Sequence, residues 1–196
     1  MKPLNTLYFL PIILFAASAG LLLAGCSTTV ATLNPSPQKP VCERESSALV
    51  IWETQWRQNQ KDIAEREFAA ETGLRQFLVQ SGCFAHSELR RINMNDLEPL
   101  KGSVDTFDKV ISITVREIGP IVMLFSTDGM IEGGTEVVLN ITEYALPDFN
   151  SKRQFSVNWF SGGAFVIKGV ESLPNDMQEA LRIGMKPDGG SSGRSF

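Results

Sequence analysis

The hydrophobic and polar positions of this chain change their period near its middle. A short apolar run, Ala48 to Trp52, is typical of a buried strand. Residues 60–80 follow with an apolar stripe at the 3.6-residue period of a helix. Later, apolar and polar residues alternate over 110–118 and 136–144, as in strands with one wet face. This order predicts an α+β fold, a mostly antiparallel sheet with a long N-terminal helix and a C-terminal helix packed on one face.

Weaker signals fill the gaps in this order. Ser81 and Gly82 end the long helix, and Pro174, in the first turn after Ser172, begins the last one. Gly119-Pro120 predicts a bend or bulge. The remaining predicted elements are strands at 83–85, 121–125 and 155–159 and a short helix at 93–97.

The amino terminus has a third pattern, one apolar stretch from Leu7 to Leu23 behind the positive charge of Lys2. It is shorter than the run of about 20 apolar residues in a transmembrane helix, and a proline and a glycine interrupt it. It ends in Leu23-Ala24-Gly25-Cys26, which resembles a bacterial lipobox. The pattern predicts a signal peptide, residues 1–25, cleaved between Gly25 and Cys26, with an uncleaved anchor helix as the alternative.

Cys26 is therefore the predicted lipidation site. The resemblance to lipoproteins implies a diacylglycerol on its sulfur and a further acyl chain, such as palmitate, on the new amino terminus, and two or more chains anchor a protein stably. Such proteins usually stay at the inner membrane when Asp follows the cysteine, so Ser27 implies the periplasmic face of the outer membrane. Residues 26–41 are interpreted as a flexible tether, 42–185 as a periplasmic α+β domain and 186–196 as a disordered tail.

The charge balance narrows the range of partners. Cleavage would remove one of 18 basic residues, Lys2, and none of the 22 acidic ones, and would change the formal net charge from −4 to −5. A mildly acidic domain without basic clusters is a poor match for nucleic acid and is not expected to lie flat on anionic lipid. The expected partners are the membrane, through the lipid, and an envelope protein complex.

Two cysteines remain once Cys26 carries lipid. Cys42 and Cys83 are predicted to form a disulfide in an oxidising compartment, with two free buried thiols as the alternative. A zinc site is not expected because His86 is the single histidine.

The chain offers no pattern for catalysis. A serine triad needs a histidine base near its nucleophile, whereas His86 is alone in a polar stretch and is interpreted as solvated or capping. No Gly-x-Ser-x-Gly elbow follows a predicted strand, and no phosphate-binding loop occurs in the sequence. Four acids that could form a glycosidase pair are interpreted as solvated hairpin charges: Glu117, Asp128, Glu132 and Glu136. We therefore expect no enzyme activity, cofactor or metal.

One region predicts an interaction surface. Residues 121–125 are apolar on both faces of a strand, and Trp159-Phe160 repeats this. Val122, Leu124 and Phe160 therefore need cover. The long helix or the tether could pack over them, a protein partner could dock on them, or the hairpin could extend into a membrane barrel.

The order of elements is similar to that of a group of periplasmic lipoprotein domains. The residues that carry this resemblance are ALVIW at 48–52, Leu78, Ser81, Gly82 and Phe84, FDKVISITVREI at 107–118 and LPNDMQEAL at 173–181. The group includes the penicillin-binding-protein activator lipoproteins, the curli-assembly lipoprotein and the amino-terminal domain of TolB. ABC-transporter auxiliary lipoproteins have a similar layout.

This resemblance covers roughly Ala48 to Gly184 and bears on function only by analogy. It implies a lipid-anchored accessory lipoprotein that binds a protein partner in an envelope assembly or secretion machine. The alternative is a subunit of an oligomeric outer-membrane export pore of the curli-secretion type, which would make the protein a homo-oligomer. An envelope hydrolase is the weakest candidate.

Overall fold

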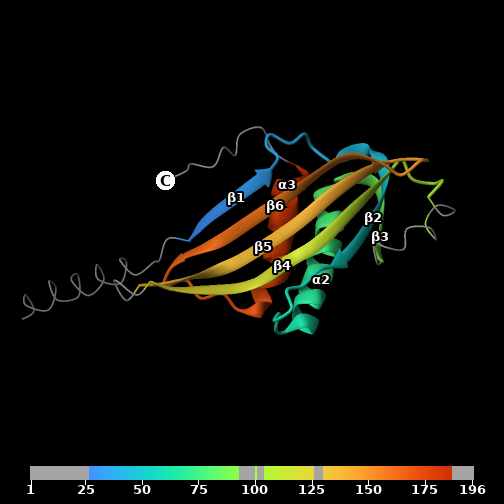
Figure 1. Cartoon of the computed structure of the whole chain (residues 1–196). Helices are drawn as coiled ribbons and strands as arrows, with labels where there is room; N and C mark the ends of the chain where they lie inside the picture. The colour runs from blue at the N-terminus through green and yellow to red at the C-terminus, as the bar shows by residue number, and fades with distance from the viewer. Residues whose placement is uncertain (1–26, 93–99, 101–103, 126–129, 187–196) are drawn as a thin grey trace, which may run out of the picture.

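The computed structural model describes residues 27–92, 100, 104–125 and 130–186. Within these ranges, the chain forms a six-stranded sheet in the order β1-β6-β5-β4-β2-β3, with two α-helices beside it (Figure 1). The elements are β1 (Thr28–Asn34), β2 (Glu43–Thr54), α2 (Ile63–Ser81), β3 (Phe84–Arg91), β4 (Lys109–Phe125), β5 (Met130–Ala145), β6 (Asn150–Ala164), the 3-10 turn η3 (Val170–Ser172) and α3 (Leu173–Met185). The predicted α+β class is confirmed.

The sheet is mixed. Strands β1, β6, β5 and β4 pair antiparallel, whereas β2 is parallel to both β3 and β4. Parallel neighbours need a long connection, and α2 is the crossover between β2 and β3. The long helix predicted over 60–80 is α2, but it follows two strands, so its description as an N-terminal helix does not match the structure.

Residues 28–34 correct the prediction of a flexible tether. They form β1, the edge strand beside β6, in a register that runs from Thr28 opposite Gly162 to Asn34 opposite Ser156. The side chain of Leu33 packs against the main core. The prediction missed this strand because the segment is short and mostly polar. An edge strand can have such a composition, since it needs only one hydrogen-bonded neighbour and one partly buried face. The sheet therefore starts two residues after Cys26.

The two strands predicted around Gly119-Pro120 are one strand, β4. Its bulge lies earlier, between Val115 and Glu117. The neighbouring β2 ends at Thr54, opposite Val115, so β4 has a free edge at Pro120. The N–H group that proline lacks needs no partner there, and the strand continues through it.

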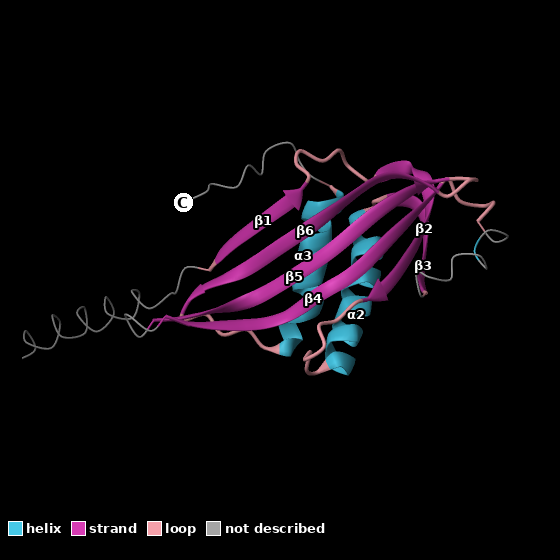
Figure 2. Ribbon diagram, viewed as in Figure 1, coloured by secondary structure: helices cyan, strands magenta, loops and turns pink. Residues whose placement is uncertain are grey.

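Both helices cover the same face of the sheet (Figure 2). They pack closely because Gly73 of α2 has no side chain: a Cβ there would lie 2.6 Å from the Cβ of Met177 and 2.6 Å from the carbonyl oxygen of Pro174. On α3, Gly184 lies against Val157 of β6 in the same way. The predicted final helix is confirmed as α3, with Ser172 at its N-cap position and a proline in its first turn.

The apolar core has two parts. The main one lies between the sheet and the helices and includes Trp52, Phe77 and Ile113. A smaller one lies near β2 and joins Leu49 and Ile51 to the residues that follow β3, including Leu100, Val104 and Phe107.

The disulfide between Cys42 and Cys83 is confirmed, with 4.6 Å between the two Cα atoms. It joins the residue before β2 to the residue before β3. Strand β3 reaches Arg91, further than the predicted 83–85, because an edge strand can be polar on much of its surface. The predicted signal peptide, the short helix at 93–97 and the tail from 187 lie outside the described residues.

Candidate functional site

Among the described elements, both helices lie on one face of the sheet, and none covers the opposite face over β1, β6 and the middle of β5. Along β6, Val157 and Trp159 are buried under the helices, whereas Ser156 and Phe160 are half-buried and Asn158 is exposed. Strand β5 alternates in the same phase. We call this surface the open face and define it by Thr28, Val30, Thr32, Asn34, Glu136, Val138, Asn140, Thr142, Ser156, Asn158 and Phe160.

The open face presents mostly hydroxyl and amide groups. Thr32 lies opposite Asn158, and Asn34 lies opposite Ser156. Hydroxyl and amide side chains both donate and accept hydrogen bonds, so this face can bind polar groups, and Glu136 is the charged residue among those that define it.

An apolar pair lies at one end of the open face. Val30 is directly opposite Phe160, and Val30 is 50% exposed. The Phe160 ring lies over two glycines, because a Cβ at Gly134 would come within 2.7 Å of the ring and one at Gly162 within 2.6 Å. The two glycines partly shield Phe160 from water. Its partner Val30 belongs to β1, which the sequence did not predict as a strand.

The structure does not unite the three predicted partner-binding residues. Phe160 is on the open face. Val122 lies opposite Gly133, which is in phase with the helix-covered residues of β5, so Val122 is on the other face and is 63% exposed. The side chain of Leu124 lies outside what the structure describes. Partner binding by these residues stays a prediction.

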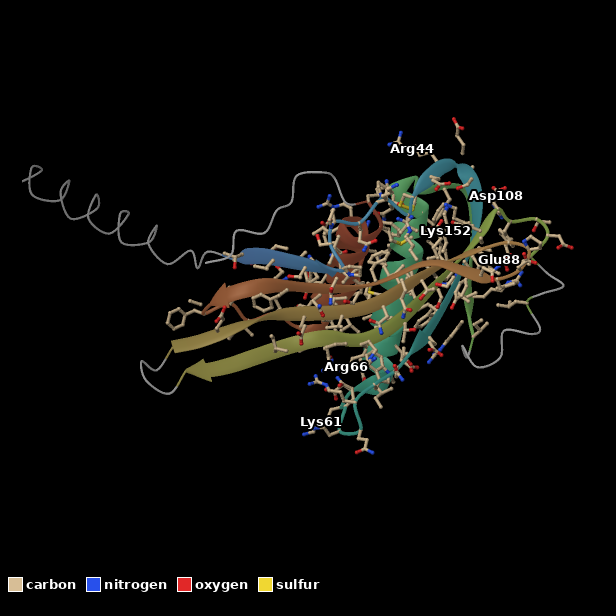
Figure 3. All side chains as sticks on the ribbon, turned by 45° about the horizontal axis from the view of Figure 1, so that its top comes forward. Arg44, Lys61, Arg66, Glu88, Asp108 and Lys152 are labelled. Carbon is tan, nitrogen blue, oxygen red and sulfur yellow. A yellow bond between two sulfur atoms is a disulfide. The ribbon has the colours of Figure 1, made fainter. Side chains whose placement is uncertain are left out.

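Glu117 corrects the prediction that the hairpin acids are solvated. Its side chain is only 7% exposed. Arg66 of α2 donates to it at 2.5 Å, Gln60 donates to it at 3.2 Å, and Arg57 forms an ion pair with it. These donors fill the edge of β4 beyond the end of β2. In Figure 3, Arg66 lies beside β4, and Lys61 projects away from the sheet.

Glu143 is a second buried acid, with 1% of its side chain exposed. Lys109 and Lys152 lie 3.1 and 3.2 Å from one carboxylate oxygen, and Arg153 lies 2.5 Å from the other. Burial raises the pKa of Glu143, but hydrogen bonds and charge from Lys109, followed by those from Arg153, outweigh it and hold the pKa below its usual value. Arg153 also donates to the carbonyl oxygens of residues 39 and 40, which fixes the crossing from β1 to β2.

Asp176 is a third buried acid, in the first turn of α3. Lys168 donates to it at 2.9 Å, and the hydroxyl of Ser172 lies 3.0 Å from its other oxygen. The ammonium group of Lys168 also lies 5.5 Å from the ring centre of Trp159. The predicted cap, Ser172, thus bonds an acid of the helix instead of a backbone N–H group.

These three acids form ion pairs inside the fold. Each is opposed by cations, so each carboxylate is satisfied within the protein. Within the described ranges, no group of three or more His, Cys, Asp or Glu residues could hold a metal ion. His86 is exposed and stacks on Phe107, with 6.1 Å between the ring centres. Of the other hairpin acids, Glu132 and Glu136 are half-buried, and Asp128 lies outside the described residues.

One of these clusters had a signal in the sequence. The inward positions of β5 are Val137, Leu139 and Ile141, and Glu143 continues the same phase. An acid in the inward phase of an amphipathic strand predicts a buried charge, which needs cationic partners. Those partners come from positions 109, 152 and 153 and could not be selected from the sequence.

Comparisons with known proteins give similar folds at low identity. No protein-family model and no curated protein matches the sequence. Among solved structures, a PelC dodecamer from Paraburkholderia phytofirmans is 14% identical with a TM-score of 0.43, over 80% of this chain and 95% of that chain. Lipoprotein GNA1162 from Neisseria meningitidis is 13% identical with a TM-score of 0.35, over 69% and 94%. A minor lipoprotein from Acinetobacter baumannii is 14% identical with a TM-score of 0.30, over 71% and 82%.

Two of these three similar structures are bacterial lipoproteins by name. Because each TM-score lies below 0.5, the likeness does not transfer the function or the assembly of those proteins to this chain. The predicted resemblance to TolB, curli-assembly and penicillin-binding-protein activator domains is not among these findings. Gly25 and Cys26 lie outside the described residues, and no helix within the described ranges is long and apolar enough to cross a membrane.

Proposed function

We propose that this protein is a lipid-anchored accessory protein of the bacterial envelope, which binds a protein partner and performs no catalysis. Residues 1–25 are removed, Cys26 carries the lipid, and the domain lies at the periplasmic face of the outer membrane. The observation on which the proposal depends most is the run Leu23-Ala24-Gly25-Cys26 at the end of an apolar leader. The disulfide supports the proposal, because disulfides persist in oxidising compartments such as the periplasm.

Replacement Cys26→Ala should release the protein from the membrane, because the variant has no thiol to acylate at this position. Fractionation of cells of the native host, followed by intact-mass measurement, would show the acyl chains on the wild type and their loss in the variant. Ser27→Asp is the matched control, because it keeps the cysteine, and we expect the lipidated protein to move to the inner membrane. A wild-type protein that keeps residues 1–25 or lacks acyl chains would disprove the anchor.

The open face is the proposed partner surface. It is uncovered, its middle is polar and uncharged, and the apolar pair Val30 and Phe160 lies at its end. Protein interfaces contain both apolar and polar side chains and are depleted in charged residues, and among its defining residues this face carries one charged residue, Glu136.

A photo-crosslinking amino acid tests this surface in cells. Placed at Asn158, which is exposed on the open face, it should give a discrete crosslinked species. Placed at Glu179, which is exposed on α3, it should give little or none. Crosslinks of equal yield at both positions, or at Glu179 alone, would reject the open face as the docking surface.

A further inference from the structure

Four exposed apolar side chains lie near the end of β4, at position 122, and in the loop and turn that follow β6, at 165, 167 and 170. Val122, Phe165, Ile167 and Val170 expose 63, 72, 87 and 55% of their surface. They are half of the eight large apolar side chains that are exposed among the described residues. We call these four residues the apolar rim.

The backbone holds the loop after β6 against the sheet. The N–H group of Val166 donates to the carbonyl oxygen of Gly163 at 3.2 Å. The carbonyl oxygen of Val166 lies over Gly133, where a Cβ would come within 2.2 Å of it. Glycine at 133 therefore allows the loop to cross the sheet, and the loop has a defined position.

Within this loop, alternate side chains point in opposite directions. Lys168 turns inward and donates to Asp176 at 2.9 Å and to Ser161 at 3.1 Å. Phe165 and Ile167 occupy the alternate positions of the loop, and their side chains project into solvent. A loop in water would ordinarily do the reverse, with its ammonium group exposed and its aromatic ring covered.

Phe165 adopts this position in an uncommon conformation. Its φ is 61°, in the left-handed region that a residue other than glycine seldom occupies. Such a conformation costs free energy and persists where the surrounding structure imposes it. The fold therefore keeps an aromatic side chain exposed in a strained backbone conformation.

The short distance along the chain between Cys26 and β1 indicates what the apolar rim contacts. Thr28 lies opposite Gly162, which lies opposite Gly134, which in turn lies opposite Ile121. Strand β4 runs on from this row to Val122 and ends at Phe125, so it passes beyond the start of β1 (Figure 1). One residue, Ser27, separates Cys26 from Thr28, so their Cα atoms are at most about 7 Å apart. A lipid on Cys26 would therefore hold this end of the sheet at the bilayer surface.

We propose that the apolar rim is a membrane-contact surface that seats this end of the sheet at the boundary between headgroups and acyl chains. This inference rests on the proposed lipidation of Cys26. The occupant is the phospholipid surface of the anchoring bilayer, since an anchor this short leaves no room for another protein between the rim and the lipid. The rim fixes the orientation of the domain, because lipid on a flexible tether alone would let it rotate.

Apolar burial drives this contact. Of the charges beside the rim, Lys168 is satisfied by Asp176, and Glu171 is an exposed acid that anionic lipid would repel. Zwitterionic lipid is therefore sufficient for the contact between the rim and the bilayer. Salt should not weaken this contact, because salt screens interactions between charges and does not weaken the burial of apolar groups.

Tryptophan quenching tests the proposal on the full lipidated protein. Ile167→Trp places a reporter in the rim, and Val79→Trp places one on α2 at a site of similar exposure, 83% against 87%. Both variants keep the same native tryptophans as background. In vesicles of phosphatidylcholine brominated on its acyl chains, we expect Ile167→Trp to lose more fluorescence than Val79→Trp, to the same extent at low and high salt.

The outcomes separate the rim from the anchor. In one outcome the protein carries acyl chains by intact mass and floats with the vesicles, but the two variants are quenched equally. This outcome would disprove membrane contact by the apolar rim and would agree with the lipid anchor. Quenching of Ile167→Trp that disappears at high salt would overturn apolar seating. Wild-type protein without acyl chains that stays out of the vesicle fraction would overturn the anchor itself, and the rim proposal with it.

Discussion

Replacement of Glu143 by Gln should lower the free energy of unfolding by about 3 kcal/mol, because removing one partner of a buried ion pair leaves the other charge uncompensated. The side chain of Lys109 is only 7% exposed, and in this variant it would lose its buried acidic partner and keep the exposed Glu43, at 2.8 Å. Urea denaturation of the wild type and the variant would measure the change.

The matched control is Glu71→Gln. Glu71 forms an i,i+4 pair with Arg75 on the surface of α2, with 39% and 60% of the two side chains exposed. Loss of such an exposed pair should cost about 0.2–0.5 kcal/mol. A Glu143→Gln variant as stable as the Glu71→Gln variant would show that the buried cluster does not stabilise the fold.

The same comparison has a defined pH dependence. The folded-state pKa of Glu143 lies below its ordinary value of 4.5, so the carboxylate contributes stability above that pH. This contribution is lost as the pH falls through the folded-state pKa. The difference in stability between wild type and Glu143→Gln should therefore narrow below pH 4.5. A difference that is constant over this range would contradict the assignment.

Removal of the disulfide by Cys42→Ala and Cys83→Ala together should lower the free energy of unfolding by about 4 kcal/mol, the loop-closure estimate for 41 residues. For a chain of this size, that loss corresponds to a fall of about 10 °C in Tm. The bond closes the loop from Cys42 to Cys83, which contains β2 and α2. Thermal unfolding of the wild type and the double variant would measure the loss.

Chemical reduction of the disulfide provides the control for the comparison of the wild type with the double variant. A reductant should lower the Tm of the wild type toward that of the double variant and leave the variant unchanged. If the reductant shifts both proteins equally, the effect does not come from this bond. If oxidised wild type and double variant unfold at the same temperature, the disulfide contributes nothing to stability.

The sequence predicted those elements whose signal is local and strong. The apolar run at 48–52 and the alternation at 110–118 each lie within an observed strand, and the helical stripe predicted at 60–80 coincides with α2 from Ile63 onward. The prediction missed β1, since backbone pairing with residues 156–162 orders it more than any apolar period of its own does. It also divided β4 at Pro120, because a proline is compatible with a strand only where an edge is free, and the free edge depends on where β2 ends.

For the candidate site, the sequence supplied residues but not their arrangement. It singled out Val122 and Phe160 as apolar positions without cover, and the register places them on opposite faces of the sheet. It interpreted Glu117 as solvated, because Arg57 and Arg66 are distant along the chain and meet it only at the edge of β4.

By itself, the sequence determined the apolar leader with its cysteine, the class of the fold and the pairing of Cys42 with Cys83, since each depends on residue type and local period. The tertiary structure decided the mixed order of the strands, the cations that neutralise the buried acids, and the gathering of Val122 with the loop after β6. It also decided that the fold begins two residues after Cys26. These features depend on pairings between distant segments, and only the folded sheet brings those segments together.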